Sequence, residues 1–278
     1  NLIENEQVTF TAAVPTIWLM LFEYLEQSGK KLDSLKSCVV GGSACPRFMM
    51  EKFYKKYGVE VLHCWGMTET SPIGTINRPL AKHYGQSFSE RLDIAVKQGR
   101  PVYGVEIKIT DENDITLPNN GKDFGNLWIR GPWICSGYLN IEKSETHGED
   151  DWFMTGDVAT IDEDGFMQIT DRTKDVIKSG GEWISSIEIE NFAVGHPSVM
   201  EAGVIGVFHP KWDERPLLII VKNENARVSK EEILDFLKDK IVSWWMPDDV
   251  VFVESLPHTA TGKIQKLALR EQFKDYKF

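Results

Sequence analysis

The first 77 residues alternate short apolar segments with amphipathic ones, and this alternation constrains the fold most strongly. Residues 37–40 predict a short buried strand that ends at Gly41-Gly42, and residues 59–64 predict a second strand that ends at Trp65-Gly66. Pro46 lies between them and suits the start of a helix. A strand–helix–strand order implies a parallel sheet with right-handed crossovers. Ligands bind such sheets beyond the carboxyl ends of the strands.

The period of the apolar residues changes near residue 99. Val105, Ile107 and Ile109 alternate with polar residues, which predicts a half-buried strand. Asp162-Glu163-Asp164-Gly165 separates two further apolar segments and is a hairpin signal. We therefore predict an αβ subdomain over residues 1–98, followed by a small antiparallel, β-barrel-like subdomain over residues 99–170.

A third pattern begins after the charged segment at residues 171–175. Ser185 and Glu188 have the spacing of a helix capping box, and the same spacing recurs from Ser229. Apolar segments between and after these positions predict strands. The sequence thus predicts an α+β lid domain over residues 176–278, which is large enough to fold alone, with residues 171–175 as a hinge.

Charge and cysteine content disfavour several classes of protein. The 278-residue chain has 42 acidic and 31 basic residues, a net charge of −11, which argues against non-specific binding of nucleic acid. Its four cysteines form no CxxC pair, so reduced thiols and a cytoplasmic location are expected. The most apolar run, residues 12–22, is interrupted by Pro15 and is shorter than the roughly 20 residues of a membrane span.

The densest cluster of chemically useful side chains is at residues 63–72. Trp65 could stack on a purine, Gly66 could admit a phosphate, Thr68 could donate a hydrogen bond and Glu69 could hold a divalent cation. The alternative is an ordinary helix start, with Thr68 as the N-cap and Glu69 in the first turn. The residues alone weigh the two interpretations about equally.

Three more segments are open to two interpretations. Asp157, in a Thr-Gly-Asp string, could bind ribose hydroxyls or belong to a plain turn. Gly180-Gly181 could admit a ligand to the backbone or form a flexible bend. Lys263 lies in a polar loop and could act on a substrate or be merely solvated. This loop is not a Walker P-loop, because the GxxxxGK[ST] string is missing.

Five motifs in order resemble those of the adenylate-forming (AMP-binding) superfamily, which includes acyl-CoA synthetases, non-ribosomal peptide adenylation domains and luciferases. They are Gly41-Gly42-Ser43-Ala44, Trp65-Gly66-Met67-Thr68-Glu69-Thr70, Thr155-Gly156-Asp157, residues 171–175 with Ser179-Gly180-Gly181-Glu182, and Thr261-Gly262-Lys263. Residues 178–186, which read KSGGEWISS, are most similar to the medium- and long-chain fatty-acid–CoA ligase branch. The resemblance extends from Val8 to Lys266.

The resemblance implies a fatty-acid–CoA ligase that uses ATP, Mg²⁺ and CoA. In this reaction a carboxylate attacks the α-phosphate of ATP to give acyl-AMP, and CoA then displaces AMP. The implied partners are these small molecules and no nucleic acid, while a homodimer and peripheral contact with a membrane are left open. Two alternatives stay open: an aryl-acid or luciferase-like ligase of the same superfamily, and a non-catalytic acyl- or nucleotide-binding fragment.

The resemblance also implies roles for individual residues. Those implied in catalysis are Lys263, Thr68, which would contact the α-phosphate, and Glu69, which would hold the metal. Those implied in nucleotide binding are Gly42, Ser43, Ala44, Trp65, Gly66, Met67, Asp157 and Arg172. Lys174 would be the hinge residue, and rotation there would exchange Lys263 for the residues of the CoA channel, Gly180, Gly181, Glu182 and Trp183.

The sequence departs from the family pattern in two respects. The phosphate loop that ends in Pro-Lys-Gly is missing, and in the family this loop precedes the point where this sequence begins. The chain thus resembles roughly the C-terminal half of such an enzyme, and it is expected to have no signal peptide and to be inactive alone. Many members have Tyr at this position. Trp65 keeps an aromatic face for stacking but lacks the phenol hydroxyl of Tyr.

Overall fold

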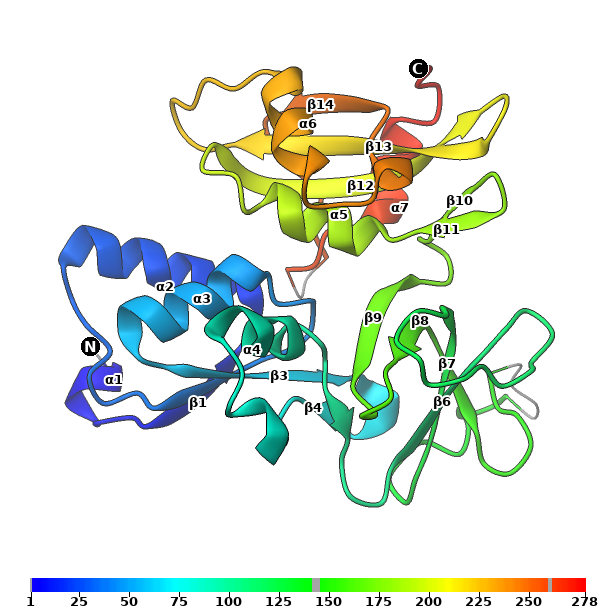
Figure 1. The fold of residues 1–278 in the computed structure, drawn as a ribbon, viewed down its shortest axis with the longest axis horizontal. Helices are drawn as coiled ribbons and strands as arrows, with labels where there is room; N and C mark the ends of the chain where they lie inside the picture. Colours follow the sequence, from blue (N-terminus) through cyan, green and yellow to red (C-terminus); the bar gives the residue numbers. More distant parts are fainter. Residues whose placement is uncertain (1, 142–145, 260–261) are drawn as a thin grey trace. The chain divides into compact units, whose positions relative to one another are not determined.

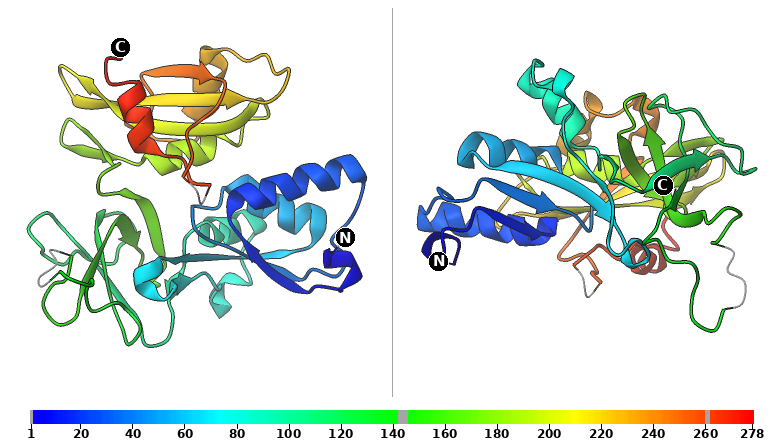
Figure 2. Two further views of the ribbon diagram at one scale, coloured as in Figure 1. Left: turned by 180° about the vertical axis from the view of Figure 1, so that it is seen from behind. Right: turned by 90° about the horizontal axis from the view of Figure 1, so that it is seen from below.

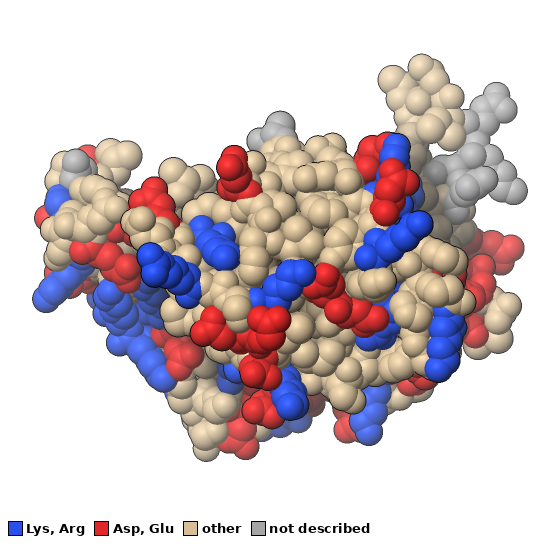
Figure 3. Space-filling view, turned by 90° about the horizontal axis from the view of Figure 1, so that it is seen from above, with Lys and Arg blue, Asp and Glu red and all other residues tan. Residues whose placement is uncertain are grey.

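The computed structural model describes residues 2–141, 146–259 and 262–278. The chain forms two compact units, Asn1–Ile169 and Thr170–Phe278, called here the first and the second unit (Figure 1). In the described parts of the chain, each helix is too short or too polar to cross a membrane. Figure 3 shows Lys and Arg side chains interspersed with Asp and Glu over one face of the molecule.

The first unit contains a five-stranded sheet in the order β1-β2-β3-β4-β5. Its strands are β1 (Phe10–Ala13), β2 (Ser37–Val40), β3 (Glu60–Gly66), β4 (Ile73–Ile76) and β5 (Arg100–Pro101). The first three are parallel, and the helices α2 (Pro15–Ser28) and α3 (Arg47–Tyr57) connect them on the same face of the sheet (Figure 1). The predicted parallel sheet with crossover helices is therefore confirmed.

Helix α2 follows from local signals in the sequence. Pro15 occupies its first turn, where the fixed φ of proline is already helical. Trp18, Phe22 and Leu25 lie one turn apart and are buried. The helix ends at Gly29, whose φ of 67° is easily adopted only by glycine. The shorter elements of this unit are α1 (Leu2–Asn5), α4 (Phe88–Ala95) and the 3-10 turns η1 (Thr68–Thr70) and η2 (Ala81–His83).

Strand β1 forms one edge of this sheet, because the described residues pair it only with β2. The ring of Phe10 on this strand is exposed. On α2, Ile17 and Met20 also face solvent, and Met20 has a relative exposure of 66%. Exposed apolar side chains thus lie both on this edge strand and on the outer face of α2.

The second sheet is open and has the order β6-β7-β8-β9. Its strands are β6 (Glu106–Thr110), β7 (Gly125–Arg130), β8 (Phe153–Ile161) and β9 (Met167–Arg172). The first three are antiparallel, as predicted. The predicted barrel-like closure does not form: β6 and β9 are the edges in the described residues, and four short strands are too few to close a barrel.

The hairpin between β8 and β9 lies at its predicted position. Asp162 Oδ1 accepts hydrogen bonds from the amides of Asp164 and Phe166, both at 2.9 Å. Gly165 closes the turn with a φ of 81°. The buried side chains of this sheet include Trp65 from β3, so that the last residues of β3 belong to the core of the second sheet.

The second unit is a sheet with helices on both faces. Its strands have the order β11-β10-β13-β12, with β14 paired to β13. They are β10 (Ile177–Ser179), β11 (Glu182–Ile184), β12 (Val199–His209), β13 (Asp213–Lys222) and β14 (Asp249–Val253). The helices are α5 (Ser186–Ala193), α6 (Lys230–Lys238) and α7 (Lys266–Gln272), and a 3-10 turn, η3, spans Ser243–Trp245.

Alternation along β12 and β13 explains this layering. Val204 and Leu218 pack with α5 and α6, whereas Ile205 and Leu217 pack on the opposite face with Leu269 of α7. Figure 2 shows α7 lying across that face. Both predicted caps are present, since Ser185 Oγ accepts from the amide of Glu188 at 3.1 Å, and Ser229 caps α6 in the same way.

Candidate active site

In the first unit, the residues predicted to bind nucleotide gather at the carboxyl ends of β2 and β3. The two strands are parallel neighbours, so the loops that follow them leave the same edge of the sheet. A Cβ atom on Gly41 would lie 3.3 Å from the carbonyl oxygen of Cys64. The loop at residues 41–45 therefore lies directly against the end of β3.

His63 on β3 holds this loop in place through a hydrogen bond to Cys45. Its side chain is fully buried, its Nε2 accepts from the amide of Cys45 at 3.2 Å, and its Nδ1 lies 3.0 Å from the carbonyl oxygen of Val96. Because the Cys45 amide can only donate, Nε2 has no proton and Nδ1 donates to Val96. Burial lowers the pKa of His63 to about 4, so the ring is neutral at pH 7. The sequence interpretation gave His63 no role.

Gly42 and Ser43 are exposed in this loop, and Ala44 is half-buried. Gly42 has a φ of 83°, and a Cβ there would lie 3.0 Å from Cγ1 of Val14. Glycine is thus required both by the left-handed backbone and by the close approach of Val14, which precedes α2. The contact brings the start of α2 beside the predicted nucleotide loop.

The glycine in the Trp65-Gly66-Met67 string has a packing role. A Cβ on Gly66 would lie 1.7 Å from the carbonyl oxygen of Pro72, so that no other residue fits there. Thr70 Oγ1 closes the same turn, since it accepts from the amide of Met67 at 2.9 Å and donates to Pro72 O at 2.6 Å. The alternative interpretation places Thr68 as the N-cap of a helix. In the structure Met67 is the N-cap, and Thr68 is the first residue of a single 3-10 turn.

Glu69 is held by a loop of the second sheet. Its carbonyl oxygen accepts from the amide of Cys135 at 2.8 Å, and its Oε1 accepts from the hydroxyl of Tyr138 at 2.9 Å. Burial raises the pKa of Tyr138 and the Glu69 carboxylate adds to the effect, so Tyr138 stays a donor. The ring of His147 packs edge-on against Tyr138 at 5.8 Å. Thr68, by contrast, is exposed.

Trp65 and Asp157 are in direct contact. The indole Nε1 donates to Asp157 Oδ2 at 2.8 Å, and the two residues are only 9% and 4% exposed. A Cβ on Gly74 would lie 2.4 Å from Trp65 Cζ3, so that β4 covers part of the ring. Asp157 does not belong to a plain turn: it lies within β8, after Gly156 with a φ of 75°.

The remaining predicted residues belong to the second unit. Gly180 and Gly181 have φ values of 59° and 86° and form the tight turn between β10 and β11, not a flexible bend. The amide of Gly180 donates to Trp212 O at 2.8 Å, whereas a Cβ on Gly181 would have nothing within 4 Å. Glu182 and Trp183 begin β11, and Trp183 lies 5.7 Å from the ammonium of Lys178. Arg172 and Lys174 are exposed.

Lys263 lies on the surface of the second unit, in a turn before α7. The amide of Thr259 donates to Lys263 O at 2.8 Å, and Lys263 N donates to Thr259 Oγ1 at 3.2 Å. Ala260 and Thr261, which belong to the same predicted loop, lie outside the described residues.

The donor set around Glu69 fits a magnesium ion that is bound mainly through a nucleotide. Mg²⁺ in such sites takes one or two protein carboxylates and completes its shell with phosphate oxygens and water. Glu69 offers one half-buried carboxylate, oriented by Tyr138. Among the described residues, no three His, Cys, Asp or Glu side chains come together as a separate metal site.

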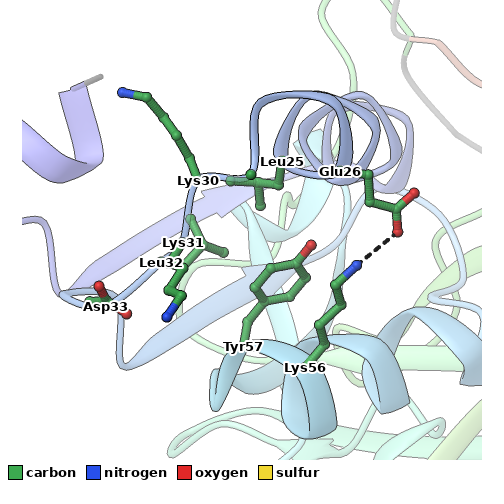
Figure 4. A pocket seen from close by; sticks show the side chains of 9 residues that line it. Leu25, Glu26, Lys30, Lys31, Leu32, Asp33, Lys56 and Tyr57 are labelled. Atoms are coloured by element: carbon green, nitrogen blue, oxygen red, sulfur yellow. Dashed lines mark hydrogen bonds and ion pairs between the residues drawn. The ribbon is translucent and has the colours of Figure 1, made fainter.

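A surface cavity of about 510 Å³ lies elsewhere in the first unit (Figure 4). It is lined by residues from the last turns of α2 and α3 and by the segment that follows α2, including Glu26, Lys31, Lys56 and Tyr57. These helices run back along the sheet, so their last turns lie toward the amino ends of β2 and β3. The cavity is therefore at the opposite edge from the loops at residues 41–45 and 67–72.

Comparison with known proteins follows the division of the chain. Residues 1–139 match the family model of the AMP-binding enzyme, and residues 188–263 match that of the AMP-binding enzyme C-terminal domain. Over 275 residues and 99% of its length, the chain is 52% identical to 3-methylmercaptopropionyl-CoA ligase of Ruegeria lacuscaerulensis and 50% identical to medium-chain-fatty-acid–CoA ligase of Ectopseudomonas oleovorans. It covers 51% and 50% of these two proteins, so it spans about half the length of the curated relatives it matches.

A solved structure gives a similar result. The anthranilate CoA ligase AuaEII, in complex with anthranoyl-AMP, is 30% identical, with a TM-score of 0.84. The match covers 98% of this chain and 51% of that one.

Proposed function

The chain belongs to the AMP-binding enzyme family, and we propose that the protein it comes from is an acid–CoA ligase that activates an aliphatic carboxylic acid with ATP. The observation that carries the proposal is a pair of oriented carboxylates: Glu69 in the turn after β3, and Asp157 on β8, where it contacts Trp65 near the end of β3. Glu69 is oriented by Tyr138 and Asp157 by Trp65, at the edge where parallel sheets bind ligands.

In the proposed first step, a carboxylate oxygen of the acid attacks the α-phosphorus of ATP, and the bond to pyrophosphate breaks. Asp157 would accept hydrogen bonds from the ribose hydroxyls, and Arg172 would assist. Thr68 donates to the α-phosphate, and Lys263 neutralises the acid and phosphate oxygens as they approach. Glu69 would hold Mg²⁺, which would supply Lewis-acid stabilisation of the phosphate charge.

In the proposed second step, the CoA thiolate attacks the acyl carbonyl carbon, and AMP leaves. Rotation at Lys174 would withdraw Lys263 and bring the turn at Gly180-Gly181 to the acyl-AMP. Because a Cβ on Gly181 would meet nothing within 4 Å, a narrow pantetheine arm has room beside this backbone. Gly180 is held in place by the hydrogen bond from its amide to the carbonyl oxygen of Trp212.

The acyl chain is proposed to enter beside the start of α2. The contact between Gly42 and Val14 brings this apolar segment against the nucleotide loop. An amino acid or a diacid would bring a second charge to apolar surroundings, and an unpaired buried charge is strongly unfavourable. This favours a medium- or long-chain fatty acid, and the similarity to a 3-methylmercaptopropionyl-CoA ligase makes short thioether acids a second class to test.

The 278-residue chain by itself is proposed to be inactive. The family's phosphate loop, which ends in Pro-Lys-Gly, would hold the β- and γ-phosphates of ATP through its backbone amides, and the 278 residues contain no Pro-Lys-Gly string. A protein that joins this chain to a segment carrying such a loop should show the activity.

The test uses the full-length protein that contains this chain. Acid-dependent exchange of pyrophosphate into ATP and formation of the CoA thioester are measured for straight-chain acids, 3-methylmercaptopropionate and benzoate. We expect both activities with aliphatic acids, and Glu69→Gln should lower both while Glu163→Gln, on the exposed hairpin, leaves them unchanged. Absence of acid-dependent exchange and thioester formation with every acid would reject the proposal.

A further inference from the structure

A buried polar network in the second unit lies directly beneath the loop that carries Lys263. The side chain of Lys266, the first residue of α7, is only 11% exposed, and its Nζ lies 3.0 Å from Glu190 Oε1 and 4.0 Å from Asp171 Oδ1. It also donates to Ser186 Oγ. Burial alone lowers the pKa of Lys266, but Glu190 and Asp171 more than offset this and the pKa is raised, so the side chain is charged.

The partners of Lys266 are themselves fixed. Asp171 is fully buried, and its Oδ2 accepts from the amide of Ser186 at 2.8 Å. Glu190 on α5 also accepts, through Oε1, from the amide of Val204 on β12 at 2.8 Å. One ammonium group thus connects the predicted hinge, the start of α5 and the central sheet. Such a network is rigid when all its members are satisfied.

The loop before α7 is anchored at both of its ends. At its start, His258 pairs with Ile264 in a β-bridge, and its Nε2 lies 3.1 Å from Glu201 Oε1. At its end, the amide of Gln265 donates to Pro257 O at 2.8 Å, and Lys266 follows directly. Lys263 is three residues before Lys266, so its backbone position depends on where α7 begins.

We propose that Lys266 is a positioning residue for Lys263: its largely shielded ion pair with Glu190 fixes the base of the loop, and through the loop the reach of the Lys263 ammonium. This inference rests on the proposed function for the role of Lys263. The contacts of Lys266 with Glu190, Asp171 and Ser186 are independent of that function, because they belong to the fold of the second unit. Lys266 itself would touch neither substrate nor nucleotide.

The first experiment needs only the 278-residue chain. Lys266→Met, Lys266→Arg and the control Lys274→Met, which removes a surface lysine paired with Glu271, are compared by amide hydrogen exchange. We expect Lys266→Met to speed exchange at Lys263 and Gln265 by about tenfold or more, with β13 unchanged, and Lys266→Arg to restore most of the protection. Unchanged exchange in the loop of a folded Lys266→Met chain would overturn the inference.

A second variant covers the case in which Lys266→Met does not fold. Removal of the cation leaves the buried Asp171 and the largely shielded Glu190 without their positive partner, so Lys266→Met combined with Glu190→Leu replaces the Lys266–Glu190 pair by apolar side chains. This variant should fold and should show the same rapid exchange in the loop. Retained protection in the loop of the double variant would equally reject the positioning role.

The second experiment uses the full-length enzyme and a double-mutant cycle. Lys266→Met should slow acid-dependent pyrophosphate exchange by about a hundredfold, as expected for a misplaced reacting group, and should spare thioester formation from supplied acyl-AMP. In the Lys263→Ala background, the same substitution should cause no further loss. A further loss of the same size in that background would show that Lys266 acts independently of Lys263.

The two experiments separate the inference from the proposed function. If the wild-type enzyme lacks ligase activity but exchange in the loop depends on Lys266, the proposed function fails and the positioning role stands. If the wild-type enzyme is active and Lys266→Met slows both half-reactions equally, the positioning role fails and the proposed function stands.

Discussion

Acidification should destabilise the first unit through the buried ring of His63. The ring is neutral in the fold because both of its nitrogens are committed, one as the acceptor from Cys45 and the other as the donor to Val96. Protonation would remove the acceptor and place a charge in a fully buried site. The folded pKa is therefore about 4, against an ordinary value of 6.5.

The size of the effect follows from these two pKa values. Between pH 6.5 and about 4 the unfolded chain binds a proton at His63 and the folded chain does not, so the free energy of unfolding falls as the pH falls. A difference of about 2.5 pKa units corresponds to about 3 kcal/mol. By the same linkage, half of this decrease in the free energy of unfolding should be reached near pH 5.3, and the decrease should be absent above pH 7.5.

The assay is urea unfolding of the first unit at several pH values, for the wild-type chain and for His63→Gln. Glutamine can accept from Cys45 and donate to Val96 but does not titrate in this range. His209→Gln, in the second unit, controls for the loss of a histidine as such. The difference in unfolding free energy between wild type and His63→Gln should shrink or reverse by about 3 kcal/mol on acidification. A difference that stays constant with pH would refute the reasoning.

Four further predictions concern the proposed reaction in the full-length enzyme. Lys263→Ala should abolish pyrophosphate exchange and spare thioester formation from acyl-AMP, and equal losses in the two half-reactions would contradict its assignment. Asp157→Ala should weaken both half-reactions, since ribose is held throughout, and a normal KM for ATP would exclude Asp157 from the nucleotide site. Gly181→Leu should suppress CoA transfer and spare exchange, measured separately, whereas the reverse pattern would place Gly181 at the nucleotide. Affinity for the acid should rise by roughly 0.8 kcal/mol per methylene and then break at one length, so a flat profile from acetate to palmitate would reject the fatty-acid assignment.

Local sequence signals predicted the elements of the fold well. The proline at the start of α2, the apolar side chains one turn apart along it, and the caps of α5 and α6 act within a few residues, so a short window contains them. The predicted strand covers residues 59–64, whereas β3 also includes Trp65 and Gly66, and the reason for this difference is not local. Trp65 and Gly66 extend the strand because they pair with β4, and such pairing is not encoded in the window around them.

The same distinction applies to the candidate site. The motif around Glu69 could be found in the sequence, but its partner Tyr138 is 69 residues away, in a loop with no spacing signal that connects the two. His63 likewise meets Cys45 only through the parallel pairing of β2 and β3. The absence of a closed barrel in the second sheet is also a matter of pairing between strands, and alternation within one strand cannot reveal it.

The open edge at β1 has a consequence for work with the isolated chain. Unpaired backbone groups on an edge strand are a template for a strand from another molecule, and the exposed side chains of Phe10, Ile17 and Met20 surround this edge and the adjacent helix with apolar surface. Concentrated samples should therefore self-associate, and light scattering should rise steeply with concentration. Met20→Lys, at an exposed position of α2, offers a simple way to keep such preparations monodisperse without changing the carboxyl edge of the sheet.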